Sequence, residues 1–575
     1  MKLLSGLVIL IALVTAVFTV SVLSKEQYEG NVFLDKYNEN NIKLDYEKTI
    51  LKKIIDKQEK KGIEISDELK ENAYKGIKEK LQEQERVDII VWVKEGYSPQ
   101  DIISNLEEFD VKYVYNSLNG FAGTANEKEI NLLKEDSKIN YIALDEEVVA
   151  QLLQSRVLIR ANLVNNNLGL TGDGIGVCHL DTGVNYNHPN LAHAYAGGYD
   201  FVNNDPDPMD DHGHGTSTAG VIVSNHTFFK GIATGADLVA VKVLNASGIG
   251  TISDVTAGIN WCVANKNTFN IEVISMSLGT LQTYTPATNP AFYDQALQTA
   301  SNNNIASVAG AGNNGVTNGL IYPAISPYVT STGASYDNNL GGQTWTFGSF
   351  TCTDTITYAD KVTCFSNRAS FLDLMAPGAI IGTTSLSALG LSSFGGTSFA
   401  APHVSGTIAL MAQRNKNLLP SQTENILKST GVQIYDNATG LSFPRVDALN
   451  SVSGMPYLSK NGSLAPNSII SLNVNAPGEN GNTYFVALAL TTSPGIPLPD
   501  GREIPLTIDP LLLLSIQNPN SVFLSYSVGI INNNIGQATM TIPNIPGIQN
   551  VEAYAAFITI NQAGQIVSVS NSVRL

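Results

Sequence analysis

The amino-acid sequence predicts an α/β domain built on a doubly wound, mostly parallel sheet, preceded by a small α+β domain of ferredoxin-like type and followed by a β-sandwich. Between residues 156 and 453 short apolar strands alternate with helical segments, which predicts parallel strands with helices on both faces. Residues 87–145 follow the order β-α-β-β-α-β, a split βαβ unit. After about residue 455 the helical period disappears, and Pro, Gly and Asn turns separate short alternating runs.

Length and composition indicate a globular protein of several domains and exclude some classes of partner. The chain has 575 residues, of which 43% are hydrophobic and 15% are charged, and its formal net charge is -17. A charge of this sign, with no basic stripe along the sequence, argues against nucleic acid or an anionic membrane surface as a partner.

Residues 1–24 predict export. One lysine precedes a long apolar run, and Val22 and Ser24 occupy positions where a signal-peptide cleavage site needs small residues. Because roughly 20 apolar residues suffice to cross a bilayer, a retained N-terminal anchor stays open as the alternative to a cleaved signal peptide. The two alternatives predict a secreted protein and a protein anchored at the cell surface.

Two segments separate the export signal from the α/β domain. Residues 25–86 mix Lys and Glu around apolar residues at helical spacing, which predicts a charged helical extension (Ile65, Leu69, Ala73, Ile77 and Leu81). The domain at 87–153 contains, in order, strand 87–94, a helix opened by Ser98 and Pro99, strands 111–116 and 120–125, a helix opened by Asn126 with Glu129 three residues later, and strand 139–144. Its place between an export signal and a larger domain indicates a propeptide.

The α/β domain is predicted at residues 154–454 and the β-sandwich at 455–575. Predicted elements of the first are strands 175–180, 238–243, 271–276 and 305–310 and helical segments 254–266 and 289–303. In such sheets reactive groups gather at the carboxyl ends of the strands. Predicted strands of the sandwich include 468–474, 483–490 and 522–529.

Four polar residues at predicted strand or helix ends are the candidates for catalysis. A serine hydroxyl becomes a nucleophile when a base takes its proton, and a neutral imidazole does so when a buried carboxylate holds its other nitrogen. Asp181 ends an apolar strand, and His214 lies between two glycines. Ser398 stands where a helix is expected to begin, and Asn313, in a glycine-rich turn, offers an amide to an oxyanion. Taken singly, each residue also fits a purely structural role.

The motifs around these residues resemble those of the subtilisin-like (subtilase, S8) serine peptidases. In that family's order of Asp, His, Asn and Ser, the chain contains DTGV at 181, HGHGT at 212, SMSLG at 275, AGAGNNG at 309 and GTSFAAPHV at 396. The similarity covers residues 156–453, and residues 87–150 resemble the family's inhibitory propeptide. The resemblance implies an endopeptidase that works through an acyl-enzyme, with Ser398 as nucleophile, His214 as general base, Asp181 as orienting acid and Asn313 as oxyanion donor.

The resemblance also implies where substrate lies. Family members pair the substrate backbone with segments that match Ser277, Leu278 and Gly279 on one side and Gly310, Ala311 and Gly312 on the other. Ile321 stands where relatives with deep pockets carry glycine. We therefore expect a shallow, uncharged S1 pocket that favours small or medium apolar residues.

An acidic loop before His214 is a candidate metal site. It contains Asp205, Asp207, Asp210 and Asp211, and clusters of oxygen ligands suit calcium, although solvated acids in a turn give the same pattern. Loop 222–232 is shorter than the loop that wraps the strong calcium site in many family members.

The four cysteines are too few for a disulfide-built scaffold and contain no CxxC pair. Cys352 and Cys364 flank a loop rich in Thr and Asp and are the candidate disulfide. Cys178 and Cys262 lie in apolar segments and are expected to be buried free thiols.

These features together predict a secreted serine endopeptidase, made as a propeptide-inhibited precursor and matured by self-cleavage within 148–157. Polypeptide substrates and its own propeptide are the expected partners, and no cofactor is expected for the chemistry, with structural calcium as the one candidate. A catalytically silent binding protein on the same fold is one alternative. A zinc hydrolase is the other, and it is disfavoured because the sequence contains no HExxH motif and no clustered Cys and His residues.

Overall fold

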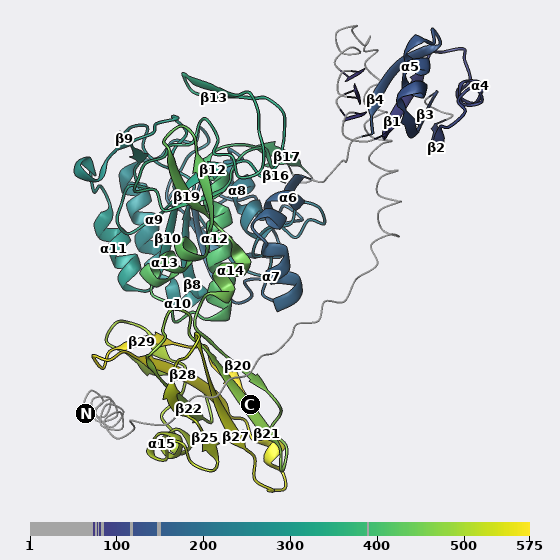
Figure 1. Ribbon diagram of the computed structural model, residues 1–575. Coiled ribbons are helices and arrows are strands. Elements are labelled where there is room, and N and C mark those ends of the chain that lie inside the picture. Colours follow the sequence, from purple (N-terminus) through teal and green to yellow (C-terminus); the bar gives the residue numbers. More distant parts are fainter. Residues whose placement is uncertain are drawn as a thin grey trace. The chain divides into compact units, whose positions relative to one another are not determined.

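The computed structural model describes residues 73–74, 77–78, 80–81, 85–115, 119–145, 151–387 and 390–575, leaving aside the side chains of 151–153. These residues belong to two compact units, one within Leu23–Val149 and one within Ala150–Leu575 (Figure 1). The predicted export segment 1–24, most of the extension 25–86 and part of the cleavage segment 148–157 lie outside the described residues. Within the described ranges, no helix has the length and hydropathy needed to cross a membrane.

The N-terminal unit has the predicted order of elements. They are β1 (Arg86–Val93), α4 (Pro99–Ile103), β2 (Asp110–Tyr115), β3 (Gly120–Asn126), α5 (Glu127–Glu135) and β4 (Ile139–Leu144). The strands form an antiparallel sheet in the order β2-β3-β1-β4. Helix α5 begins with a capping box, because Asn126 Oδ1 accepts the N–H of Glu129 and the Glu129 carboxylate accepts the N–H of Asn126.

A nine-stranded sheet lies at the centre of the second unit. Its order is β18-β19-β15-β12-β10-β8-β5-β7-β6, and only β18 runs antiparallel to its neighbour. The strands are β5 (Gly176–Asp181), β6 (Tyr195–Asp200), β7 (Asp237–Lys242), β8 (Ile271–Met276), β10 (Ala306–Gly310), β12 (Thr330–Ser335), β15 (Leu374–Pro377), β18 (Val432–Asp436) and β19 (Leu441–Arg445). The prediction of a mostly parallel sheet is confirmed.

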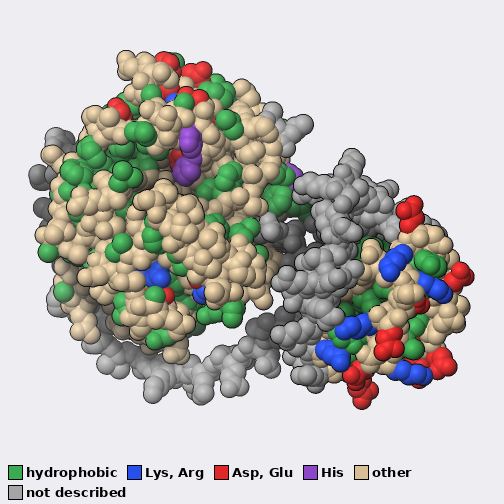
Figure 2. Space-filling model, turned by 90° about the horizontal axis from the view of Figure 1, so that it is seen from above, with side chains coloured by type: hydrophobic (Ala, Val, Ile, Leu, Met, Phe, Trp, Pro, Cys, Tyr) green, Lys and Arg blue, Asp and Glu red, His purple; other side chains and the backbone are tan. Residues whose placement is uncertain are grey.

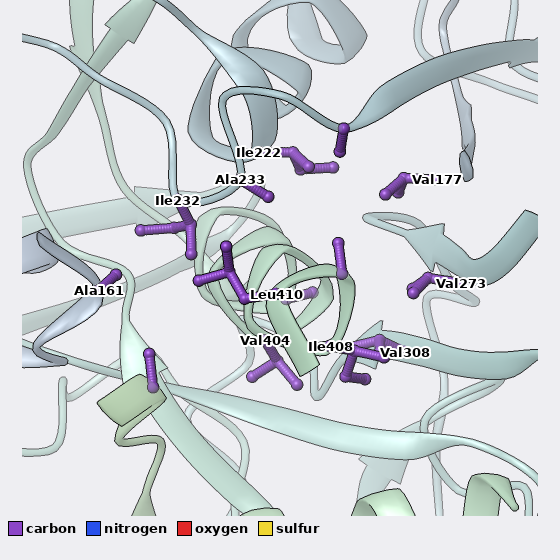
Figure 3. Packing of buried hydrophobic residues seen from close by; sticks show 14 of the residues in the cluster. Ala161, Val177, Ile222, Ile232, Ala233, Val273, Val308, Val404, Ile408 and Leu410 are labelled. Atoms are coloured by element: carbon purple, nitrogen blue, oxygen red, sulfur yellow. The ribbon is translucent and has the colours of Figure 1, made fainter. Parts of the chain in front are cut away.

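Helices cover both faces of this sheet, as predicted. One face packs against α7 (Ala161–Leu168), α8 (His214–Val223), α12 (Thr397–Arg414) and α14 (Ala448–Ser453), and the other against α9 (Ile252–Ala264) and α11 (Asp294–Asn302). Figure 3 shows the first face, where Val177, Val273 and Val308 of three neighbouring strands lie along one side of α12. Because side chains alternate along a strand, the next residues, such as Cys178 and Ile274, enter the core on the opposite face.

Helix α11 begins five residues later than predicted. Pro290 lies in the segment before it, and Ala291 has a φ of +51°, so the backbone there cannot be α-helical. The helix itself starts at Asp294.

Helix α12 carries the candidate nucleophile near its start. It begins at Thr397, one residue before Ser398, and the preceding Gly396 has a φ of +148°. Pro402 lies inside the helix, and because proline has no N–H, the carbonyl of Ser398 has no helical donor. The hydroxyl of Ser277 takes that place and donates to Ser398 O at 2.7 Å.

The C-terminal region forms the predicted sandwich, with one helix that was not expected. Its sheets are β20-β21-β27-β25 and β26-β22-β28-β29, and β30 pairs with β28. The strands are β20 (Tyr457–Asn461), β21 (Ile469–Asn475), β22 (Thr483–Ala489), β25 (Leu524–Ser525), β26 (Val528–Ile530), β27 (Ile535–Thr541), β28 (Tyr554–Ile560), β29 (Ile566–Val569) and β30 (Val573–Arg574). The unexpected helix is α15 (Pro510–Gln517), in which Asp509 caps the N–H of Leu512 at 2.9 Å and Pro510 is the first residue.

All four cysteines are paired. Cys352 and Cys364 form the expected disulfide. Cys178 and Cys262 form a second one, so the expectation of two free thiols is wrong. A sequence separation of 84 gave no sign of the pairing, but β5 and α9 pack together and bring the two Cα atoms to 6.1 Å.

Candidate active site

Asp181 and His214 form a direct pair at the carboxyl end of β5. Asp181 is fully buried, and its Oδ1 lies 2.7 Å from Nδ1 of His214. Asp181 also accepts the N–H of Thr182 at 2.7 Å and the hydroxyl of Thr218 at 3.2 Å. The imidazole stands on the first residue of α8, and a quarter of its side chain remains exposed. This geometry fixes the ring so that Nδ1 is the protonated nitrogen and Nε2 is free to take a proton.

The charges around this pair set its protonation. Burial alone would lower the pKa of His214, but the negative charges of Asp181 and Asp210 and the hydrogen bond to Asp181 outweigh burial and raise that pKa above 6.5. Burial acts to raise the pKa of Asp181, yet the neighbouring His214 and His179 and the donated hydrogen bonds keep it below 3.8. Asp181 therefore stays ionised when the imidazole gains a proton.

The carboxylate of Asp210 links the loop that follows Asp181 to the segment that carries His214. Its Oδ1 accepts the hydroxyl of Thr182 and the N–H groups of His212 and Gly213, at 2.9 to 3.0 Å. Its Oδ2 accepts the N–H of Thr216 at 2.9 Å as well as the hydroxyl of that residue. One carboxylate thus joins the residue that follows Asp181 to the segment that surrounds His214.

The carboxylates of the predicted calcium ligands are engaged in hydrogen bonds with protein donors. The oxygens of Asp210 are taken up by protein donors, Asp207 Oδ1 accepts the hydroxyl of Tyr186 at 2.7 Å, and Asp205 Oδ1 accepts the N–H of Asp207 at 2.9 Å. Asp211 pairs with the buried Lys242 at 2.7 Å. Among the described residues, no three His, Cys, Asp or Glu side chains are grouped so that they could hold a metal ion. The assignment of Asp205, Asp207 and Asp210 as calcium ligands therefore stays a prediction, and the hydrogen bonds of these carboxylates do not favour it.

Ser398 and Asn313 meet at the start of α12. Asn313 Oδ1 accepts the N–H and the hydroxyl of Thr397, at 2.8 and 3.0 Å, which leaves Nδ2 as the outward donor. A methyl group built on Gly396 would lie 3.3 Å from Asn313 Nδ2 and 3.7 Å from Ser398 N. A side chain at position 396 would therefore begin beside both nitrogens, and glycine keeps that position free.

The resting hydroxyl of Ser398 points to a backbone carbonyl. Its Oγ donates to Ser277 O at 3.3 Å, while the ring of His214 lies 6.0 Å, centroid to centroid, from the ring of Phe399, the next residue along α12. The structure thus brings Ser398 to the side of the base without a hydrogen bond between them. Such bonds are often loose before substrate binds.

The predicted substrate segments lie beside Ser398. Ser277, Leu278 and Gly279 follow β8, whereas Gly310, Ala311 and Gly312 end and follow β10. Cβ atoms built on Gly279 and Gly312 would lie 2.5 and 2.7 Å from side-chain carbons of Ile321. The isoleucine therefore fills the space between the two segments, close to where the S1 pocket is expected.

Three residues of this region were not recognised in these roles from the sequence. His179 is buried with Nε2 3.1 Å from both Gly215 O and Thr218 Oγ1, and 3.9 Å from Asp181. Its position two residues before Asp181 puts both side chains on one face of β5, and that spacing was the available signal. Asp210 and Lys242 gave no comparable signal, because their partners lie on other elements. Lys242 Nζ donates to Thr182 O at 2.7 Å.

One face of the α/β domain carries few charged side chains. Figure 2 shows histidine side chains on this face among mostly hydrophobic and uncharged ones, with acidic side chains gathered at its edge. Such surroundings suit an uncharged peptide segment better than a highly charged ligand.

Comparison with known proteins identifies a family. Residues 172–484 match the model of the subtilase family of peptidases. An alkaline protease of Alkalihalobacillus alcalophilus is 32% identical over 369 residues, which are 62% of this chain and 85% of that protein. Serine protease AprX of Bacillus subtilis (strain 168) is 30% identical over 405 residues, 66% of this chain and 91% of that protein.

Two solved structures also match. A cold-adapted subtilisin-like serine proteinase is 30% identical with a TM-score of 0.40, and the match covers 48% of this chain and 90% of that one. Sphericase is 28% identical with a TM-score of 0.42, covering 50% and 97%. On the family match and the sequence relatives, this chain belongs to the subtilase family and is a subtilisin-like serine endopeptidase that acts on polypeptides.

Proposed function

We propose that the chain is exported as a precursor, is held inactive by its N-terminal unit, and after maturation cleaves polypeptides through an acyl-enzyme on Ser398. One arrangement supports the chemistry most. Asp181 holds Nδ1 of His214 at 2.7 Å, and Asn313 Nδ2 and Ser398 N face one spot beside the nucleophile.

In the proposed reaction the Ser398 hydroxyl leaves Ser277 O by rotation about its Cα–Cβ bond and attacks the scissile carbonyl. Nε2 of His214 takes the hydroxyl proton, and Asp181 stabilises the resulting imidazolium. The carbonyl oxygen becomes an oxyanion between Asn313 Nδ2 and Ser398 N. When the tetrahedral intermediate collapses, the C–N bond breaks, the imidazolium protonates the leaving amine, and a serine ester remains. Water then repeats the sequence and releases the second product.

Serine labelling tests this assignment. Ser398→Ala is expected to abolish peptide hydrolysis and labelling by a fluorophosphonate, because the hydroxyl is both nucleophile and attachment point. Ser277→Ala, whose hydroxyl only supports Ser398 O, should still be labelled. A Ser398→Ala protein that is labelled and active would contradict the proposal.

The propeptide role of the N-terminal unit rests on its own folded core. A cluster that includes Ile89, Val91 and Phe121 makes the unit compact without the α/β domain. On the other face of its sheet Trp92 lies 5.6 Å from Tyr141, which leaves an aromatic surface suited to packing on a protein. Purified precursor should gain activity only as it is cleaved within 148–157. Mass spectrometry of the intact protein measures this cleavage. A Ser398→Ala precursor cleaved in pure form would exclude self-cleavage.

Ile321 is the proposed determinant of the S1 pocket. Its side chain occupies the space beside Gly279 and Gly312, so small or medium apolar P1 residues should be preferred. Ile321→Gly is expected to improve kcat/KM for P1 Phe relative to P1 Ala by roughly tenfold, as a deeper apolar pocket would. A peptide library cleaved mainly after Lys, Arg or Tyr by the unaltered enzyme would refute this assignment.

A further inference from the structure

A disulfide-anchored hairpin stands next to the candidate active site. Its strands are β13 (Gln343–Phe347) and β14 (Phe350–Asp354), within the connection from β12 to β15 (Figure 1). The hairpin is fixed at three points. Cys352 is bonded to Cys364, Trp345 Nε1 donates to the Tyr336 hydroxyl at 2.8 Å, and that hydroxyl donates to Asp354 at 2.9 Å. The hairpin is thus a firmly attached part of the α/β domain.

Trp345 of this hairpin presses on the turn before the nucleophile. A Cβ built on Gly395 would lie 2.1 and 2.4 Å from two carbons of the indole, so the ring is packed directly on the glycine backbone. Gly395 is followed by Gly396, which faces the two oxyanion donors, and then by the first turn of α12. Two successive glycines have wide backbone freedom, and the indole restricts it from outside.

Phe350 presses in the same way on the loop that carries Asn313. A Cβ built on Gly315 would lie 2.5 Å from Cζ of Phe350, and Gly315 N donates to Phe365 O at 2.8 Å. The segment between the hairpin and β15 adds support, because Asn367 N donates to Gly312 O at 2.8 Å. Both loops that supply an oxyanion donor are therefore held by one hairpin and the segment that follows it.

We infer that Trp345 and Phe350 are positioning residues that hold Ser398 N and Asn313 Nδ2 at the spacing an oxyanion requires. The inference rests on the proposed function, in which these two donors stabilise the tetrahedral intermediate. Donors act best at 2.7–3.1 Å from the oxyanion, and a displacement of about 1 Å can cost on the order of a hundredfold in rate. Neither ring has to touch substrate for this effect.

Phe347 provides a matched control on the same hairpin. Its ring packs on Phe365 at 5.1 Å, as the ring of Trp345 does at 5.0 Å, but its atoms are not among the nearest neighbours of Gly395 or Gly315. Phe347→Ala therefore removes a comparable amount of core packing and leaves both glycine contacts in place. If Trp345 served only to fill the core, Phe347→Ala and Trp345→Ala should lower kcat equally.

The experiment measures kcat and KM of the matured full chain on a peptide p-nitroanilide with alanine at P1, normalised by active-site titration. Trp345→Ala is expected to lower kcat at least tenfold with KM changed less than twofold, because binding is kept and transition-state stabilisation is lost. Trp345→Phe should restore most of kcat, since a ring remains on Gly395. Phe347→Ala should keep kcat within twofold of the unaltered enzyme.

Combination with Asn313→Ala separates this inference from the proposed function. If Trp345 acts through the oxyanion donors, Trp345→Ala should cost no more than about threefold in the Asn313→Ala background. The inference would be overturned if the losses of kcat in Trp345→Ala and Asn313→Ala multiplied fully in the double variant. It would also be overturned if Phe347→Ala lost as much kcat as Trp345→Ala. An unchanged kcat in Asn313→Ala alone would instead overturn the oxyanion assignment. If Trp345→Ala does not fold, Phe350→Leu takes its place with the same expected pattern.

Discussion

The two halves of the proposed active site are held together by different physical means. The acid–base half, formed by Asp181 and His214, is fixed by buried hydrogen bonds, five of which end on the carboxylate of Asp210. The nucleophile half, formed by Ser398 and Asn313, depends on backbone packed closely against other groups at Gly315, Gly395 and Gly396. Charge and proton position matter in the first half, whereas distance between donors matters in the second.

Because of this difference, the two halves are sensitive to different kinds of substitution. Hydrogen-bonded carboxylates tolerate small shifts in position but not the loss of their charge or of a partner. The packing around the glycines involves no charge, but a methyl group added at Gly396 would lie 3.3 Å from Asn313 Nδ2 and 3.7 Å from Ser398 N, on a backbone with a φ of +148° that side chains rarely adopt. Substitutions in the nucleophile half should therefore change kcat without changing its pH dependence, and substitutions in the acid–base half should change both.

Among substitutions that keep the four candidate catalytic side chains, filling the oxyanion site should have the largest effect on turnover. Gly396→Ala is expected to lower kcat by roughly 10²–10³, because its methyl group would lie beside both donors and the loss should match that of an oxyanion donor. The measurement is kcat on a peptide p-nitroanilide as a function of pH. Gly197→Ala is the control, since Gly197 has nearly the same φ, +149°, and a Cβ there would meet only the ring of Phe269. Equal losses in both variants would mean that backbone strain alone is responsible.

Neutralising Asp210 should have the next largest effect and should move the pH profile. Asp210→Asn is expected to lower kcat about tenfold to a hundredfold, because an amide cannot accept all five hydrogen bonds. It also removes a negative charge that, together with Asp181, raises the pKa of His214 against the effect of burial. The base must be neutral, so kcat/KM rises as pH increases through that pKa, and its acid limb should shift to lower pH in the variant.

His179, which lies 3.9 Å from Asp181, should stay neutral in this comparison. Its pKa is lowered chiefly by burial, and loss of the negative charge of Asp210 would lower it further. An acid limb that does not move, or that moves to higher pH, would contradict an electrostatic role of Asp210. Gly396→Ala should leave the limb where it is.

The sequence predicts the contacts of the acid–base half better than those of the nucleophile half. The fold, the strand ends and the four motif residues follow from periodicity and from resemblance to the family, and the capping box at Asn126 follows from local chemistry. The polar partners of the acid–base half were partly visible, since His179 and Asp181 share a strand face. The sequence singled out Asp210 as an acidic residue but did not predict its hydrogen bonds, because their donors come from two separate segments.

The supports of the nucleophile half could not be predicted. Trp345 and Gly395 are far apart in the sequence, and neither residue type indicates that they touch. The disulfide between Cys178 and Cys262 was missed for the same reason, because only the packing of α9 on β5 brings them together. Helix α15 was missed although its Asp-Pro start is a recognisable signal, because the surrounding strand pattern outweighed it.

The two disulfides should affect the two halves differently. Cys352→Ala with Cys364→Ala loosens the hairpin and is expected to lower kcat about threefold. Cys178→Ala with Cys262→Ala releases β5 from α9 and should leave kcat within twofold. Its closed loop is longer, however, with a separation of 84 residues against 12, so chain entropy predicts a larger loss of stability, about 4.6 against 2.8 kcal/mol. Denaturant unfolding and kcat should be measured on both variants. The first pair of substitutions is expected to lose more kcat, and the second is expected to lose more stability.

The smallest effect is expected at the exposed acids of the loop before His214. Asp207→Asn removes a carboxylate that accepts the Tyr186 hydroxyl at the surface, and it should change the free energy of unfolding by no more than about 0.5 kcal/mol. Asp210→Asn, three residues later and 5% exposed, should cost about 1–3 kcal/mol, because it leaves buried donors unpaired. If the loop held calcium through both residues, their substitutions would have similar effects, and chelation would lower the Tm of the unaltered protein but not of either variant. The expected result is a clear difference between the two acids and a Tm that chelation at this loop does not change, since the oxygens of Asp210 are already occupied by the hydrogen bonds that hold the acid–base half.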